Sequence, residues 1–142
     1  DAAFAGGVRV ATADLDGSGP NPAAVVTGPG PGGGPHVVLR RADGTIVQHF
    51  QAFEASYTGG VYVAGGDVSG DANHEIVVGS GEAGATRVAV FSSGGAALST
   101  VPLASVGAGG GARVAAGEVS GTRAVTVGAG PGGRPLVTLF AL

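Results

Sequence analysis

Three segments of this 142-residue chain carry the same order of short motifs, and this repetition limits the fold more than any other feature. A Gly-Gly pair leading into an alternating apolar run opens each copy, at Gly6–Ala11, Gly59–Ala64 and Gly110–Ala115. An acidic turn follows, and then a glycine-rich segment. We therefore expect one domain over 1–142, with full repeats at about 6–58 and 59–109 and a partial repeat at about 110–142.

Each copy has the pattern of a β-structure. Apolar residues alternate with others in steps of two, as at Val8 and Val10 or Val61 and Val63, and Gly or Pro interrupts the chain every eight to twelve residues or so. This spacing predicts four strands in each full repeat and three in the last. We expect them near 7–13, 23–28, 36–42, 45–53, 60–66, 75–80, 86–92, 96–103, 111–117, 123–128 and 135–141.

The glycine-rich segments match G-x-G-x-x-G, first at Gly28, Gly30 and Gly33. In a dinucleotide-binding loop this pattern opens a helix, whose N-terminal amides hold the pyrophosphate. Here strand-like segments follow instead, at 37–40, 88–91 and 137–140. A phosphate loop of the Walker type also needs a lysine, and the chain has none. We interpret the three segments as turns between strands, whose glycines allow close packing.

Composition narrows the class of protein further. Hydrophobic residues make up 44% and aromatic residues only 5%, so many strand positions carry Ala, Gly or Val on both faces. Such strands suit sheets stacked closely on one another, as in propeller blades. With seven arginines against ten acids and no basic run, we do not expect nucleic acid as a partner. We also expect no membrane insertion, and zero cysteine excludes disulfides while leaving the compartment open.

The order GGVRVATADLDG, AVVTGPGPGGGPHVVL, GTIVQHFQAFEASYTGG and GGVYVAGGDVSGDANHEIVVG resembles FG-GAP (VCBS-type) repeats, which are related to the blades of the integrin α-subunit propeller. The resemblance covers nearly the whole chain. It implies an all-β fold of propeller-type blades, each of about four antiparallel strands. It also implies a non-catalytic extracellular or cell-surface protein that binds partners, acts in adhesion or supports architecture.

The family further implies a calcium loop, D-x-[DN]-x-D-G-x-x-D, between the first two strands of a blade. The second repeat matches it best, with Asp67, Ser69, Asp71 and Glu75 at positions 1, 3, 5 and 9 and the carbonyl of Asn73 at position 7. The first repeat keeps Asp14, Asp16 and Ser18 in a longer loop. The third keeps only Glu118 and Ser120, and we expect no site there. The other interpretation is that all these residues simply favour turns.

Histidines offer little chemistry. His36, His49 and His74 are the only three, and the other repeats have Arg87 and Leu136 where the first has His36. A histidine that an equivalent turn replaces with leucine is expected to pack rather than to react. The sequence contains neither G-x-S-x-G nor H-E-x-x-H.

Two full repeats and a partial one are too few for a propeller, which typically has four to eight blades. We expect the open ends to be completed by a homodimer that closes a six-bladed ring, by further repeats of a longer chain, or by head-to-tail growth into a fibre. Protein or glycan ligands are further candidate partners. The alternative function is a carbohydrate-binding or carbohydrate-active propeller, lectin-like or glycosidase-like, for which an enzyme would need converging carboxylates about 5–10 Å apart.

Overall fold

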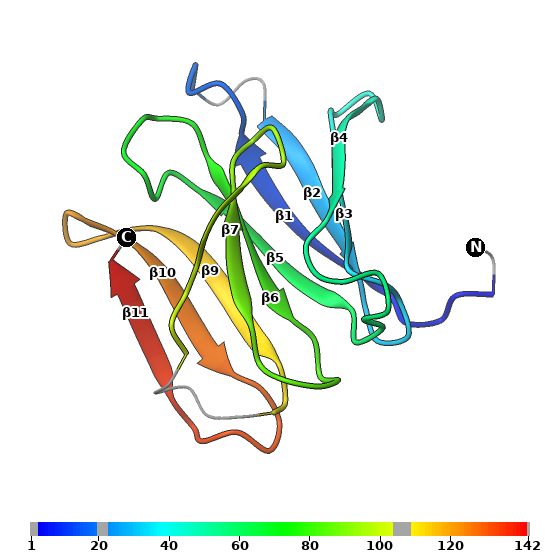
Figure 1. The fold of residues 1–142 in the computed structure, drawn as a ribbon. Helices are drawn as coiled ribbons and strands as arrows, with labels where there is room; N and C mark the ends of the chain where they lie inside the picture. Colours follow the sequence, from blue (N-terminus) through cyan, green and yellow to red (C-terminus); the bar gives the residue numbers. More distant parts are fainter. Residues whose placement is uncertain (1–2, 20–22, 104–108, 142) are drawn as a thin grey trace.

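The computed structural model of the chain describes residues 3–19, 23–103 and 109–141. These ranges contain eleven β-strands and no helix, and they form three antiparallel sheets that follow one another across Figure 1. The first sheet comprises β1 (Val8–Asp14), β2 (Ala23–Pro29), β3 (His36–Arg40) and β4 (Ile46–Gln51). The second comprises β5 (Val61–Gly66), β6 (Glu75–Ser80), β7 (Val88–Phe91) and β8 (Ala97–Thr100). The third comprises β9 (Ala112–Val119), β10 (Thr122–Ala129) and β11 (Val137–Ala141).

The expected all-β class is confirmed, and each strand overlaps its expected range. Within every sheet each strand pairs with the next one in the sequence, and none of the three sheets closes on itself.

The eighth strand ends at Thr100 rather than at 103, because Pro102 lacks an N–H for further pairing. At the β9–β10 hairpin, Ser120 and Gly121 both have positive φ, 50° and 79°, which is the geometry of a tight two-residue turn.

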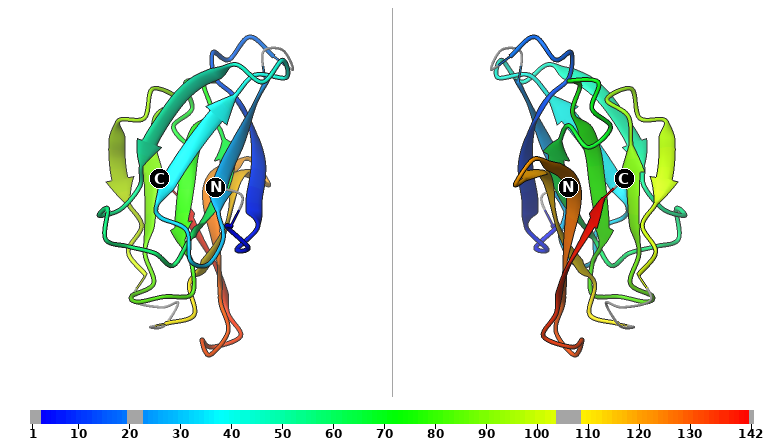
Figure 2. Two further views of the ribbon diagram at one scale, coloured as in Figure 1. Left: turned by 90° about the vertical axis from the view of Figure 1, so that its right-hand side faces the viewer. Right: turned by 90° about the vertical axis from the view of Figure 1, so that its left-hand side faces the viewer.

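The sheets stack face to face with two apolar cores between them (Figure 2). Residues of one strand alternate between the two faces of its sheet. In β5, Val61 and Val63 therefore join the core shared with the first sheet, whereas Ala64 joins the core shared with the third. The central part of the middle sheet is covered on both sides: every residue of β6 and β7 is buried, whereas every residue of β8 is exposed.

Glycines permit this close stacking. A side chain at Gly28 in β2 would collide with Val61 of the second sheet, and one at Gly79 in β6 would collide with the carbonyl of Ala112 in the third. The next glycine of the motif makes the same backbone hydrogen bond in all three copies. The N–H groups of Gly30, Gly81 and Gly130 donate to the carbonyls of Gly7, Gly60 and Gly111 at 2.9, 2.8 and 3.0 Å.

Each glycine motif begins in the last two residues of a strand and continues into the turn to the next strand, as expected. They join β2 to β3, β6 to β7 and β10 to β11. In the first and third, a Pro-Gly turn places glycine at positive φ, with Gly32 at 85° and Gly132 at 80°. The second has Glu82 in place of proline, and Glu82 is the centre of the cluster described below.

The packing predicts unequal responses to the same substitution at two equivalent glycines. Gly79→Ala should lower the free energy of unfolding by about 1–3 kcal/mol, because the new methyl group meets the third sheet. At Gly128 only Cβ of Arg113 comes near, at 3.9 Å, so Gly128→Ala should be neutral or stabilise by about 0.5–1 kcal/mol. Urea denaturation in dilute solution measures both, and equal losses would contradict this stacking.

Candidate functional site

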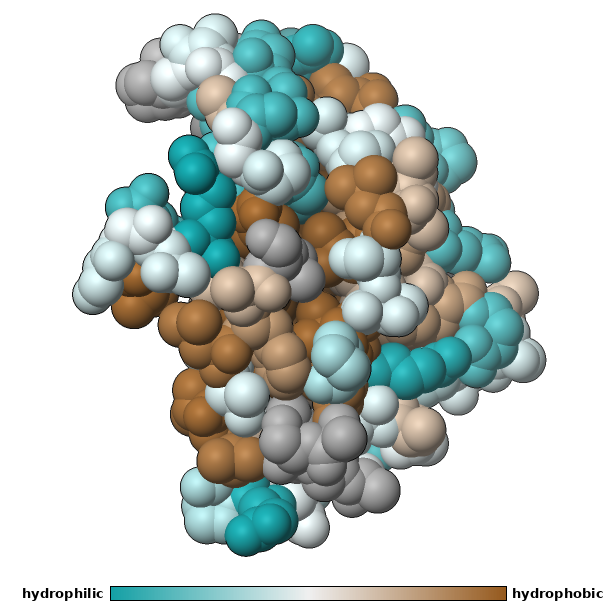
Figure 3. Space-filling view, turned by 60° about the vertical axis from the view of Figure 1, so that its left-hand side comes forward, coloured by the Kyte–Doolittle hydropathy of each residue, from teal (hydrophilic) through white to brown (hydrophobic). Residues whose placement is uncertain are grey.

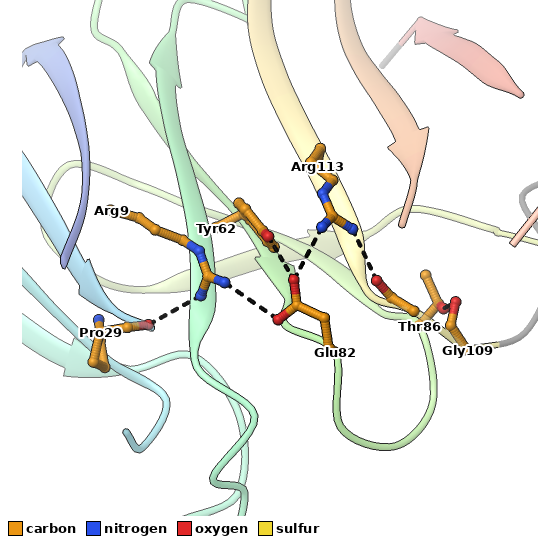
Figure 4. A network of polar contacts seen from close by, with 8 residues as sticks. Arg9, Pro29, Tyr62, Glu82, Thr86, Gly109 and Arg113 are labelled. Carbon is orange, nitrogen blue, oxygen red and sulfur yellow. Dashed lines mark hydrogen bonds and ion pairs between the residues drawn. The ribbon is translucent and has the colours of Figure 1, made fainter. Parts of the chain in front are cut away.

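A cluster of connected polar side chains lies where the first strands of the three sheets converge (Figure 4). Arg9 of β1, Tyr62 of β5 and Arg113 of β9 occupy the same position in their repeats. The Tyr62 ring carries both guanidinium groups, with Cζ of Arg9 at 3.8 Å and Cζ of Arg113 at 4.7 Å from the ring centroid. Both distances allow cation–π attraction.

Glu82, from the β6–β7 loop, connects these three residues. Its carboxylate accepts hydrogen bonds from Nη2 of Arg9 at 3.2 Å, from Nη2 of Arg113 at 3.0 Å and from the Tyr62 hydroxyl at 2.6 Å. Each arginine also anchors to a backbone carbonyl, that of Pro29 or that of Gly110, at 3.3 and 2.9 Å. One carboxylate thus ties side chains from all three sheets together.

The environment of Glu82 favours its ionised form. Partial burial alone would raise the pKa of Glu82, but the Tyr62 hydroxyl and the two guanidinium groups outweigh it and lower the pKa. The pKa of Tyr62 is raised by its burial and by its hydrogen bond to Glu82. The three charges leave the cluster with one net positive charge, and its hydrogen bonds are made within the chain. These are the properties of a structural link.

Sequence reasoning missed this cluster, although two signals for it were present. The three Gly-Gly motifs carry long polar side chains at one shared position, Arg9, Tyr62 and Arg113. In the glycine-rich segments, the second copy has the acid Glu82 where the other two copies have Pro31 and Pro131.

A second ion pair lies at the opposite edge of the first two sheets. Arg87 donates to both carboxylate oxygens of Glu54, at 2.6 and 3.1 Å, and its Cζ lies 4.3 Å from the ring centroid of Phe53 and 5.0 Å from that of Tyr57. The pair holds the pKa of Glu54 below its ordinary value. Beside it is an open groove of about 770 Å³, lined by residues of β7 and β8 together with residues at 51–53, 86–87, 101 and 103.

The acidic loops lie between the first two strands of their sheets, where the sequence placed them. In the first loop, Asp14 accepts hydrogen bonds from the backbone N–H groups of Asp16, Gly17 and Gly19 at 3.3, 3.2 and 3.0 Å. Asp16 accepts one from the N–H of Ser18 at 3.1 Å, and contacts with Ser18 lower the pKa of Asp16. These bonds close the turn.

In the second loop the carboxylates also meet N–H donors. Asp67 accepts hydrogen bonds from Gly70 N–H at 2.5 Å, from Ala72 N–H at 3.3 Å and from Nε of Arg123 in the third sheet at 3.2 Å. Burial alone would raise the pKa of Asp67, but the Gly70 N–H and the charge of Arg123 outweigh it and lower the pKa. Asp71 is exposed and accepts from the N–H of Asn73 at 2.9 Å.

Glu75 differs from the other acids of this loop because it is almost completely buried. Its Oε2 accepts hydrogen bonds from the backbone N–H groups of Val68 and Ser69, both at 2.9 Å, and these bonds connect the beginning of the loop to its end. Across the described residues, no three side chains of the His, Cys, Asp or Glu type come together as ligands of one metal ion. Calcium binding by either loop remains a prediction.

The histidines take part in packing contacts. His36 and His49 meet edge to face on the exposed outer side of the first sheet, with Nε2 and Nδ1 3.3 Å apart. The N–H of His74 donates to the carbonyl of Asp14 at 2.7 Å and so joins the two acidic loops.

A scan against models of protein families, a search of curated proteins and a search of solved structures each found no match to the chain. None of the described segments forms a helix that could span a membrane. The resemblance to FG-GAP repeats therefore stands on the sequence motifs alone.

Replacing Glu82 tests the link between the sheets. Glu82→Gln should destabilise the fold at pH 7 by about 1 kcal/mol, because its bonds to arginine lose their charge in a half-exposed setting. The pKa of Glu82 is lowered by folding, so its contribution is present above the unfolded pKa of about 4.3 and disappears as the pH falls through the folded pKa. The two proteins should therefore become equally stable at low pH. Glu118→Gln, at an exposed acid on β9, is the control, and an equal effect of both variants would contradict the link.

Calcium should stabilise the chain if the acidic loops bind it. For a dissociation constant on the order of 10⁻⁴ M, millimolar calcium adds about 1.4 kcal/mol, or roughly 3–6 °C in melting temperature. EDTA should remove this gain and Asp71→Ala should abolish it. Asp43→Ala is the matched control, because Asp43 closes an ordinary turn by accepting the Thr45 N–H at 2.8 Å. Identical melting with calcium and with EDTA would exclude the site.

Proposed function

We propose that the chain is a non-catalytic structural or binding module of the FG-GAP type, located outside the cell or at its surface. In this proposal the three sheets act as propeller-type blades. Support comes from the antiparallel order of each sheet, the stacking of successive sheets, and the acidic loop between the first two strands of the first and second sheets. Partner binding, adhesion and calcium loops follow from the family resemblance.

The observation that carries this proposal is the contrast between the inner and the outer sheet faces. Large apolar side chains are exposed on the outer face of the first sheet, among them Val8 and Val10, and on the outer face of the third sheet, among them Val137 and Leu139. Figure 3 shows apolar side chains gathered on the side of the molecule that carries β11. Exposed apolar faces of this kind mark surfaces of association. We propose that the chain assembles with itself through them, as a homodimer that completes a six-sheet ring.

The acids favour a structural role over an enzymatic one. Glu54, Asp67 and Glu82 are ion-paired with arginine, and Glu75 is buried under two backbone N–H donors. A glycosidase instead needs a protonated and an ionised carboxyl group on either side of a bound sugar. Screening the same sample on a glycan array and on hydrolase substrates tests the carbohydrate alternative. Turnover of a glycoside would overturn the non-catalytic assignment.

Self-association should be visible as a change of mass with concentration. Sedimentation velocity from about 5 μM to 1 mM should show one chain giving way to two. Val10→Asp should suppress the larger species, because it places a charge on an apolar contact. Leu98→Asp is the matched control, since Leu98 is 54% exposed but lies on β8 of the middle sheet. A single-chain mass at every concentration would contradict assembly, and unlimited growth would indicate a fibre in place of the ring.

A further inference from the structure

The outer face of the third sheet carries apolar side chains at the same positions as the equivalent faces of the first and second sheets. Those two faces are covered, and the face of the third sheet is exposed. Val137 and Leu139 of β11 are 69% and 44% exposed. Their equivalents in the first sheet, Val37 and Leu39, are 0% exposed. Those in the second sheet, Val88 and Val90, are each 2% exposed. In both of those sheets the covering layer is the following sheet of the chain, and no described residue covers the third.

The outer face of the first sheet carries the other side of this kind of contact, namely the apolar residues of a first strand that in the later sheets pack on the preceding sheet. Val8 and Val10 of β1 are 65% and 67% exposed. Their equivalents in β5, Val61 and Val63, are 0% and 8% exposed because they pack on the first sheet. In β9 the corresponding Ala112 is 0% exposed against the second sheet. The first strand of the second sheet and that of the third thus pack against the face of the sheet before them.

Glycines on the two outer faces also match one another. Gly28 and Gly79 lie against the first strand of the next sheet, whereas Gly128 has open space in front of it. Gly60 lies against Gly30 of the preceding sheet, but a side chain at Gly7, its equivalent in the first sheet, would meet nothing within 4 Å. At each end of the stack, one outer sheet face therefore has the residues that make an internal contact, but no described residue packs against it.

We infer that two copies of the chain join head to tail: the outer face of β9–β11 in one copy receives β1 of the other, with Val8 and Val10 seated over Gly128. This inference rests on the proposed self-association and names the surfaces that meet. The contact is continuous with packing that the chain already uses twice, which argues for a second copy as the occupant. Two unlike faces meet, so a single contact leaves one face of each kind free for a second contact.

Charge modifies this joint. In the contact between the first two sheets, Arg9 lies over Tyr62. Repeat equivalence puts Arg113 in the place of Arg9, and Arg9 of the second copy in the place of Tyr62. Two guanidinium groups then face each other, and Pro31 stands where Glu82 would neutralise them. About 0.5 M NaCl, at which charges are screened over a few ångströms, is therefore the condition for testing the joint.

Two variants that each spoil one face test the pairing. Val10→Asp blocks the outer face of β1–β4 and leaves the other intact. Gly128→Leu blocks the outer face of β9–β11, and the open space at Gly128 lets the single chain fold with the larger residue. Head-to-tail pairing predicts that each variant alone is a single chain at 1 mM and that an equimolar mixture contains a two-chain species. Circular dichroism and thermal melting check that each variant is folded, with Val8→Asp and Leu139→Asp as replacements where one is not.

The outcomes separate the pairing from the assembly itself. If wild type associates but Val10→Asp alone still pairs, the third sheets meet each other and the inference is wrong. If Gly128→Leu alone still pairs, the first sheets meet each other and the inference is equally wrong. An associating wild type with a mixture that stays single-chain also overturns the head-to-tail joint while leaving self-association standing. A wild type that never associates refutes the proposed assembly.

Discussion

Face-to-face packing of small-residue sheets is the constraint on which the rest of the structure depends. Gly28 and Gly79 let the first strand of the next sheet approach so closely that a methyl group would collide with it. This approach buries Val61, Val63 and, in β9, Ala112, and apolar burial is the main favourable contribution to folding. The chain has few aromatic residues with which to fill wider gaps. Its stability therefore depends on keeping the sheets close together.

Polar contacts lie around these layers rather than inside them. Glu82 joins side chains of all three sheets, and Asp67 pairs with Arg123 to connect the second sheet to the third. Both carboxylates have lowered pKa values although burial alone would raise them, because N–H, O–H and arginine donors outweigh it. Such links connect specific side chains of neighbouring sheets, whereas apolar packing has no directional requirement.

The strands and their grouping could be predicted because alternation, glycine and proline act locally and recur three times. The glycine motifs were rejected as phosphate loops on the strands that follow them, and the structure places each motif between two strands. The Glu82 cluster could not be predicted in the same way, since Arg9 and Glu82 are distant in sequence and meet only after two sheets have stacked. Likewise, only the fold shows that Glu75 accepts hydrogen bonds from the backbone of its own loop and that Asp67 pairs with Arg123 of another sheet.

The most direct measurement is the exposure of individual methyl groups to a soluble paramagnetic probe, followed by NMR as the protein is concentrated. In dilute solution Val8, Val10, Val137 and Leu139 should relax quickly, while Val61, Val63, Val88 and Val90 stay protected. As the two-chain species forms, the first group should become as protected as the second. If the first group stays exposed while the mass doubles, the outer faces are not unused halves of the internal contact.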